Sequence, residues 1–125
     1  MFKHMVIGLL VVGACTLGAE ANAGGYVGIR PLDVPTRMTL GQRVEVSFML
    51  EAQDGTPMRQ LSPFVVLRHG DRTLQVPASE SKVPGRYVAS VRASEAGRWT
   101  MTIDSRLCGN ARALPALTVV AAATH

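Results

Sequence analysis

The chain has 125 residues, of which 13 are Lys or Arg and 9 are Asp or Glu, and its formal net charge is +4. A chain of this length forms one ordinary domain around a single core. The charge excess is modest and contains no basic run, which argues against a nucleic-acid partner.

The first 23 residues have the pattern of an export signal. Lys3 gives a basic start, an apolar run follows at residues 5–17, and Ala-Asn-Ala at 21–23 is a small-residue cleavage site. The apolar run is shorter than the roughly 20 residues that span a membrane. We therefore predict a signal peptide at 1–23, cleavage after Ala23, and a periplasmic mature domain of residues 24–125 without a transmembrane span.

The same segment contains an alternative. Val12-Gly13-Ala14-Cys15 resembles a lipobox, in which Cys15 would be lipidated and would anchor the protein to a membrane leaflet. The Ala-x-Ala pattern favours cleavage after Ala23. In either case Cys108 is the one free thiol of the mature domain, which then has no internal disulfide. Cys108 is interpreted as a small buried hydrophobe, or alternatively as an intermolecular disulfide or a soft metal ligand.

The first half of the mature domain predicts strands separated by turns. A first strand is expected around residues 34–40, after a lead-in interrupted by prolines. In residues 43–51 apolar and polar side chains alternate, so one face is buried and the other, which includes Met49, is exposed. Residues 64–69 are more continuously apolar, and a Gly-Asp turn joins them to a strand at 72–76.

The strongest pattern runs from Val83 to Asp104 and predicts a β-hairpin. Apolar side chains occupy positions 87, 89, 91 and 93, and again 99, 101 and 103, with mainly polar residues between them. Both apolar sets fall on one face if a three-residue loop, Glu95-Ala96-Gly97, closes the hairpin. This register gives three opposed pairs: Ala93 with Trp99, Val91 with Met101, and Ala89 with Ile103.

After the hairpin, residues 105–115 have an irregular pattern and residues 117–121 form a last strand. The total is about seven short strands with no amphipathic helix. This pattern predicts an all-β fold, an immunoglobulin-like antiparallel β-sandwich.

Three corner motifs carry a resemblance to a known family. They are Asp54-Gly55-Thr56-Pro57, Pro84-Gly85-Arg86-Tyr87 and Ala96-Gly97-Arg98-Trp99. Between residues 35 and 103 the chain resembles the YtkA-like family of bacterial exported domains, and more loosely the CopC-type sandwiches. The resemblance implies an immunoglobulin-like fold in the cell envelope and an accessory or copper-associated role. The CopC-type copper residues, an N-terminal His and a later Asp-Gly-His, have no counterpart here, so none is carried over.

The catalytic motifs that can be tested, G-x-S-x-G, H-E-x-x-H and Cys-x-x-Cys, do not occur in the sequence. His69 and Cys108 could form a base and nucleophile pair in space. However, a histidine beside Gly70-Asp71 is more often a solvent-facing turn residue. We therefore predict that the protein is not an enzyme and has no catalytic residue and no cofactor.

Soft side chains support an alternative function, which is periplasmic copper handling or a metallochaperone role. Among the methionines and the cysteine of the mature domain, the sequence pattern gives the weakest structural explanation for Met49, Met58 and Cys108. Thioether and thiolate sulfurs of this kind suit Cu(I) as ligands. No two of them stand at ligand spacing, and exposed methionines serve equally well as a contact surface.

Arginines support the leading hypothesis, a non-catalytic accessory or binding module of the bacterial cell envelope. In the hairpin register Arg92 and Arg98 are diagonal neighbours, and Arg86 lies near Arg106, which makes one basic strip on one sheet. Such a strip can dock an acidic partner, which we expect to be another envelope protein. The alternative is an ordinary solvated face.

Overall fold

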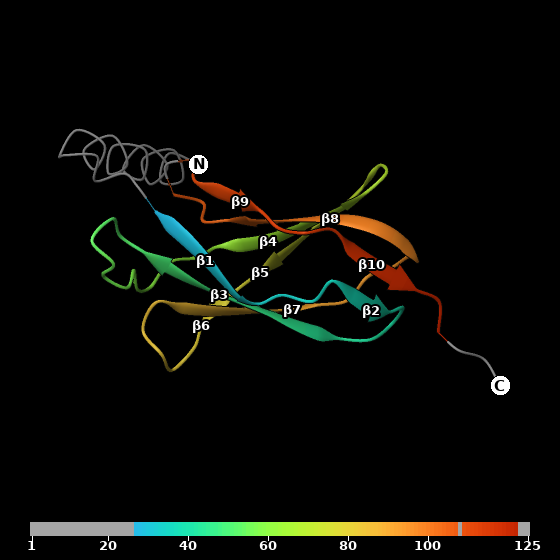
Figure 1. Cartoon of the computed structure of the whole chain (residues 1–125), viewed down its shortest axis with the longest axis horizontal. Helices are drawn as coiled ribbons and strands as arrows, with labels where there is room; N and C mark the ends of the chain where they lie inside the picture. The colour runs from blue at the N-terminus through green and yellow to red at the C-terminus, as the bar shows by residue number, and fades with distance from the viewer. Residues whose placement is uncertain (1–26, 108, 123–125) are drawn as a thin grey trace, which may run out of the picture.

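The computed structural model describes residues 27–107 and 109–122, which are entirely strand and loop. Figure 1 shows the ten strands of this part of the chain: β1 (Gly28–Asp33), β2 (Arg37–Thr39), β3 (Val44–Glu51), β4 (Phe64–His69), β5 (Arg72–Pro77), β6 (Ser79–Glu80), β7 (Arg86–Val91), β8 (Gly97–Asp104), β9 (Ala111–Ala113) and β10 (Leu117–Val120). Within these described ranges, no helix is long and apolar enough to cross a bilayer.

The strands form two facing sheets (Figure 1). The first sheet has the order β1-β3-β7-β6 and is antiparallel throughout. The second has the order β2-β10-β8-β4-β5, with β9 paired to another part of β8. The β2–β10 pair is parallel, and the other pairs of this sheet are antiparallel. The predicted all-β sandwich is therefore confirmed.

The core takes alternate residues from the longest strands. Six of them leave at most 1% of their surface exposed: Tyr87, Ala89 and Val91 from β7, and Trp99, Met101 and Ile103 from β8. From β3 come Val46, Phe48 and Leu50, which are fully buried. The alternation in the sequence therefore identified the buried face of all three strands.

The predicted hairpin is wrong. β7 pairs with β3 and β6, whereas β8 pairs with β4, β10 and β9. The chain after Val91 crosses from the first sheet to the second, so β7 and β8 face each other across the core. The predicted register requires only that both apolar faces point into the same core, and two strands on opposite sides of a core meet that condition equally well.

Three strands lie where loops were expected, namely β1, β6 and β9. β1 runs through Pro31, which a strand at the edge of a sheet tolerates because no neighbour needs the missing N–H. β6 and β9 have two and three residues, so they are too short to show an alternating pattern. A fourth difference is that the strand expected around residues 34–40 covers only Arg37–Thr39.

The expectation that Met49 is exposed is also wrong, since only 9% of its surface is accessible. Met49 points away from the core, but it lies between Arg30 on β1 and Arg86 on β7. The aliphatic parts of long arginine side chains can cover such an apolar neighbour. Ser47, two residues earlier, is buried on the same side and accepts a hydrogen bond from the Asp33 N–H at 3.2 Å.

Candidate functional site

Two of the corner motifs meet at one end of the sandwich. Gly85 has a φ of +80°, and a Cβ at this position would lie 2.6 Å from the Cβ of Pro57. The hydroxyl of Tyr87 donates to the Met58 carbonyl at 2.7 Å and accepts from the Leu61 N–H at 3.0 Å. Burial raises the pKa of Tyr87 above its usual value. These contacts attach the β3–β4 loop to the sandwich.

Glu80 fixes the same loop from the side of β6. Its two carboxylate oxygens accept from the Gly85 N–H at 2.9 Å and the Gln60 N–H at 3.0 Å. Arg59 lies 3.6 Å from one of these oxygens. The two backbone hydrogen bonds hold the pKa of Glu80 below its usual range. The loop is therefore fixed by several independent contacts.

The third corner motif lies at the opposite end of β7, where His69 packs on it. The imidazole stacks on the Trp99 indole with ring centroids 5.0 Å apart, and its Nδ1 lies 3.0 Å from the Arg98 carbonyl, to which it donates. Its Nε2 is 3.6 Å from Glu95 Oε1, and Arg72 binds the other Glu95 oxygen at 2.8 Å. The side chain of His69 is 30% exposed, so it reaches solvent at the strand end, as expected, while one ring face is covered by Trp99.

The candidate metal ligands do not come together in the described chain. Met49 lies on the outer side of the first sheet, whereas Met58 packs against the hydrophobic core. Cys108, the third candidate ligand and the possible partner of His69, lies outside the described residues. Among residues 27–107 and 109–122, no three His, Cys, Asp or Glu side chains lie close enough together to hold a metal ion. Copper binding by Met49, Met58 and Cys108 stays a prediction.

The predicted basic strip is divided between the two sheets. Arg86 belongs to β7 and Arg92 follows it, in the first sheet, whereas Arg98 belongs to β8 and Arg106 follows that strand, in the second. The division follows directly from the absence of a β7–β8 hairpin. A single surface therefore does not present all four arginines, although each remains a candidate partner contact.

A different set of arginines shares the outer face of the second sheet. Arg37, Thr118 and Arg98 form one row across β2, β10 and β8. Arg68 on β4 lies opposite Thr100 and is therefore a diagonal neighbour of Arg98. We call Arg37, Arg68 and Arg98 the arginine face. In the sequence, the signal that points to it is the alternation of Arg98, Thr100 and Thr102 with buried residues in β8.

The arginine face carries uncompensated positive charge. All three arginines are exposed, and no described residue forms an ion pair with any of them. The carboxylate on the same outer side is Asp104, at the far end of β8, and one of its oxygens accepts from the Arg106 N–H at 2.8 Å. The face can therefore attract an anionic group without first breaking an internal salt bridge.

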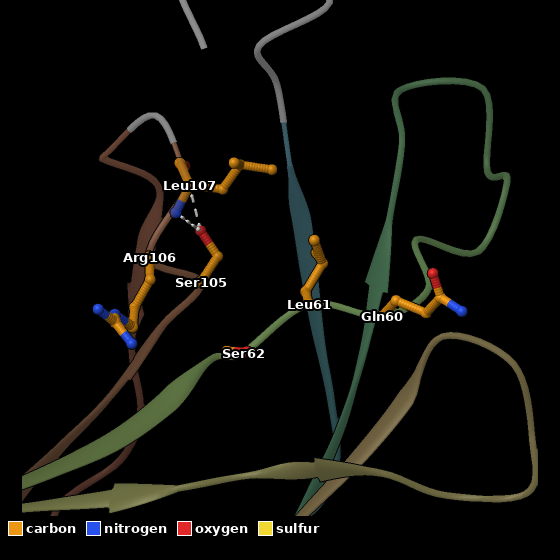
Figure 2. A pocket seen from close by; sticks show the side chains of 6 residues that line it. All are labelled: Gln60, Leu61, Ser62, Ser105, Arg106 and Leu107. Carbon is orange, nitrogen blue, oxygen red and sulfur yellow. Dashed lines mark hydrogen bonds between the residues drawn. The ribbon is translucent and has the colours of Figure 1, made fainter. Parts of the chain in front are cut away.

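A hollow of about 260 Å³ opens between the β3–β4 loop and the loop after β8. Its lining consists of Gln60, Leu61, Ser62, Ser105, Arg106 and Leu107. Figure 2 shows Leu61 and Leu107 standing between the two loops, while the Gln60 and Arg106 side chains extend outward on either side. No sequence pattern predicts this hollow, because its two walls are more than forty residues apart in the chain.

No family model and no curated protein matches the chain. Solved structures match it in fold. The Lin-41 filamin domain aligns with a TM-score of 0.59 and 16% identity, over 74% of this chain and 90% of that one. Domains 4 and 5 of the S-layer protein SbsC align at 0.54 and 19%, over 74% of this chain and 51% of that structure.

A third match is E. coli alpha-2-macroglobulin, with a TM-score of 0.55 and 14% identity, over 77% of this chain and 6% of that protein. The match therefore covers about half of the two-domain SbsC structure and a small part of alpha-2-macroglobulin. The filamin-type and S-layer matches confirm the immunoglobulin-like β-sandwich. At such identities they show the fold alone.

Proposed function

We propose that the protein is an exported, non-catalytic binding module of the bacterial cell envelope, and that its arginine face docks an acidic partner protein. The observation that carries the proposal is the set of three exposed arginines on one sheet, none of which forms an ion pair with a described residue. Guanidinium groups bind carboxylates in a bidentate geometry, and the strand register fixes the backbone positions from which the three side chains extend. Docking through this face needs no rearrangement of the sandwich.

The location rests on the first 23 residues and on the YtkA-like resemblance. We place the mature module in the periplasm with Gly24 at its N-terminus, and anchoring through Cys15 is the alternative. Intact-mass measurement of the protein from an exporting cell separates these outcomes. A mass that corresponds to a chain beginning at Gly24 supports cleavage after Ala23. A mass that includes a diacylglyceryl group on Cys15 instead supports a membrane-anchored form.

The arginine face is tested with an Arg68→Ser/Arg98→Ser double variant. The probe is a fluorescent polyglutamate peptide, and binding is followed by anisotropy at low and at physiological salt. We expect the variant to bind about tenfold more weakly, because two exposed charge pairs are lost. The affinity of the wild-type protein should fall as salt rises, since exposed charges are screened.

The matched control is Arg43→Ser/Lys82→Ser. It removes the same charge from two exposed residues, one just before β3 and one between β6 and β7, on the side of the other sheet. We expect its affinity to stay within about twofold of the wild-type value. Equal weakening by both pairs would show that the peptide senses net charge only, and the arginine face would then be rejected as the docking site.

A further inference from the structure

The hollow is flanked by two residues with unusual backbones. Gln60 and Arg106 both have a φ of +61°, and among the described residues they are the non-glycine positions with positive φ. Both line the same hollow. This conformation is costly for a residue with a Cβ, whereas glycine adopts it freely. Strain of this kind concentrates at binding sites, where the side chain or the chain direction is needed.

The walls of the hollow are fixed before any ligand arrives. On one wall, the Leu61 N–H is bound by the Tyr87 hydroxyl. On the other, the Ser105 hydroxyl accepts from the Leu107 N–H at 3.2 Å and donates to the Asn110 carbonyl at 2.8 Å (Figure 2 shows the contact with Leu107). Ser105 is only 2% exposed. The two leucines therefore line a preformed apolar gap.

Arg106 stands at the rim of this gap with its charge available. Its guanidinium carbon lies 4.4 Å from the centre of the Phe64 ring. Stacking of this kind holds the guanidinium flat and leaves the N–H groups in its plane free for a carboxylate. None of the described residues that line the hollow is acidic. The nearby carboxylates of Asp104 and Glu80 are bound to backbone N–H groups.

The size of the hollow limits what it can take. At about 260 Å³ it is smaller than the roughly 300–1,000 Å³ that holds a drug-sized ligand. It is also open on one side, so a free small molecule would remain partly in water. An apolar group that is part of a larger partner fits these limits, because the rest of the partner supplies contacts elsewhere.

We propose that the hollow is a subsite for one aliphatic side chain of an acidic partner segment, whose neighbouring carboxylate binds Arg106. Phe64, which supports Arg106, lies on β4 on the same outer side as Arg68. The subsite therefore continues the arginine face, and a segment that crosses the face reaches the hollow at its end. This inference rests on the proposed function, since it gives the same partner a second contact.

The test uses two short acidic peptides that differ at one position, where the first has leucine and the second has serine. We expect the wild-type protein to bind the leucine peptide about tenfold more tightly, because one aliphatic side chain leaves water. Ser62→Leu, which fills the hollow, should abolish this preference. The control Ser90→Leu, at an exposed position on β7, should retain it.

Arg106→Gly tests the charge at the rim and controls for folding. Because glycine accepts a φ of +61° without strain, this variant should melt at or above the wild-type temperature. It should nevertheless bind both peptides about fivefold more weakly, since the carboxylate contact is lost. A variant that binds as tightly as the wild-type protein would remove Arg106 from the subsite.

The outcomes separate the subsite from the arginine face. Equal binding of the two peptides to the wild-type protein, with weaker binding of both to Arg68→Ser/Arg98→Ser, overturns the subsite and keeps the face. A leucine preference that survives Ser62→Leu also overturns the subsite. A leucine preference that only Ser62→Leu abolishes, in a protein whose face variants bind normally, keeps the subsite and overturns the face. Absence of binding to either peptide overturns both.

Discussion

The two ends of the sandwich are built on the same three-residue pattern and closed in different ways. Gly85-Arg86-Tyr87 leads into β7, which begins at Arg86, and Gly97-Arg98-Trp99 begins β8. In each, the glycine has a positive φ and a ring lies where its Cβ would be, Pro57 in the first case and His69 in the second. In each, the aromatic residue is fully buried and donates a hydrogen bond to a backbone carbonyl.

The difference lies in where these hydrogen bonds lead. Trp99 Nε1 donates to the Glu95 carbonyl at 2.9 Å, only four residues earlier, so this end closes its own turn. The Tyr87 hydroxyl instead reaches Met58, 29 residues away, and Leu61, 26 residues away. The Tyr87 end therefore holds a distant loop that forms one wall of the hollow. A change at Trp99 should affect the core, whereas a change at Tyr87 should affect the hollow.

Removal of the indole is expected to have the largest effect. Trp99→Ala should cost about 3–5 kcal/mol, the range for a large aromatic taken from a core. A domain of this size has only about 5–15 kcal/mol in total, so urea unfolding should show a protein close to unfolded. A urea midpoint close to the wild-type value would mean that burial of Trp99 contributes little to the free energy of unfolding.

The Tyr87 end is also tested by the addition of a single methyl group at Gly85. Gly85→Ala should cost about 2–4 kcal/mol, because it adds a clash with Pro57 to the strain of a positive φ. Gly55→Ala is the control, since Gly55 has a φ of +90° and no atom within 4 Å of an added Cβ. We expect about 1 kcal/mol there. Equal losses in urea unfolding would show that the contact with Pro57 does not matter.

Removal of the Tyr87 hydroxyl should affect one end of the sandwich and leave the other unchanged. Tyr87→Phe leaves the Met58 carbonyl and the Leu61 N–H without this partner, at a cost of about 1–2 kcal/mol. The rate of backbone amide hydrogen exchange should rise in residues 57–62 and stay unchanged around Glu95 and Trp99. Uniform acceleration at both ends would contradict the assignment of Tyr87 to the loop.

The Tyr87 end should also be the more sensitive to acid, through Glu80. The Gly85 and Gln60 N–H groups hold its pKa below the usual 4.5. Because this pKa is lower in the folded state than in the unfolded state, the stabilisation is complete above about pH 4.5 and is lost as the pH falls through the folded value. In urea unfolding between about pH 3 and pH 6, Glu80→Gln should therefore lose less stability than the wild-type protein.

Asp54 serves as the internal reference for this experiment. Its pKa is also lowered, by hydrogen bonding from Thr56, and it titrates in both proteins. The difference between the two pH profiles therefore reports Glu80 alone. Superimposable profiles would remove Glu80 as a source of acid sensitivity.

The smallest effect is expected from the two methionines near the Tyr87 end. Met49→Leu/Met58→Leu conserves volume, so stability should change by less than about 1.5 kcal/mol. We expect Cu(I) affinity, measured by competition with a chromogenic chelator, to be the same in both proteins. A tight Cu(I) complex that the double variant loses would replace the binding-module proposal with copper handling.

The sequence was sufficient to identify which faces are buried, but not which strands are neighbours. Alternation assigned Tyr87, Val91, Trp99 and Ile103 to the core correctly. The same pattern arises whether two strands pair in one sheet or face each other across a core, so it could not decide between a hairpin and a crossing. The division of the basic strip follows from this one ambiguity.

Local patterns also could not show what covers a residue from a neighbouring strand. Met49 alternates with core residues and was expected in water, but Arg30 and Arg86 lie on both sides of it. The hollow depends in the same way on two distant loops that Tyr87 and Ser105 fix separately. In the sequence, the candidate site on the second sheet is visible only as the polar face of β8, on which Arg98, Thr100 and Thr102 alternate with buried residues.

The position of β10 has a consequence for biosynthesis. β10 lies between β2 and β8 and is the link between them in the sheet, yet its residues 117–120 are made after those of every other described strand. The ribosome must therefore reach Val120 before the second sheet can close. Until β10 is made, β2 has no partner in the second sheet and β8 lacks one, so this sheet is completed late in synthesis. This order suits the export that we propose, because a domain that completes its fold late can still be threaded through a membrane.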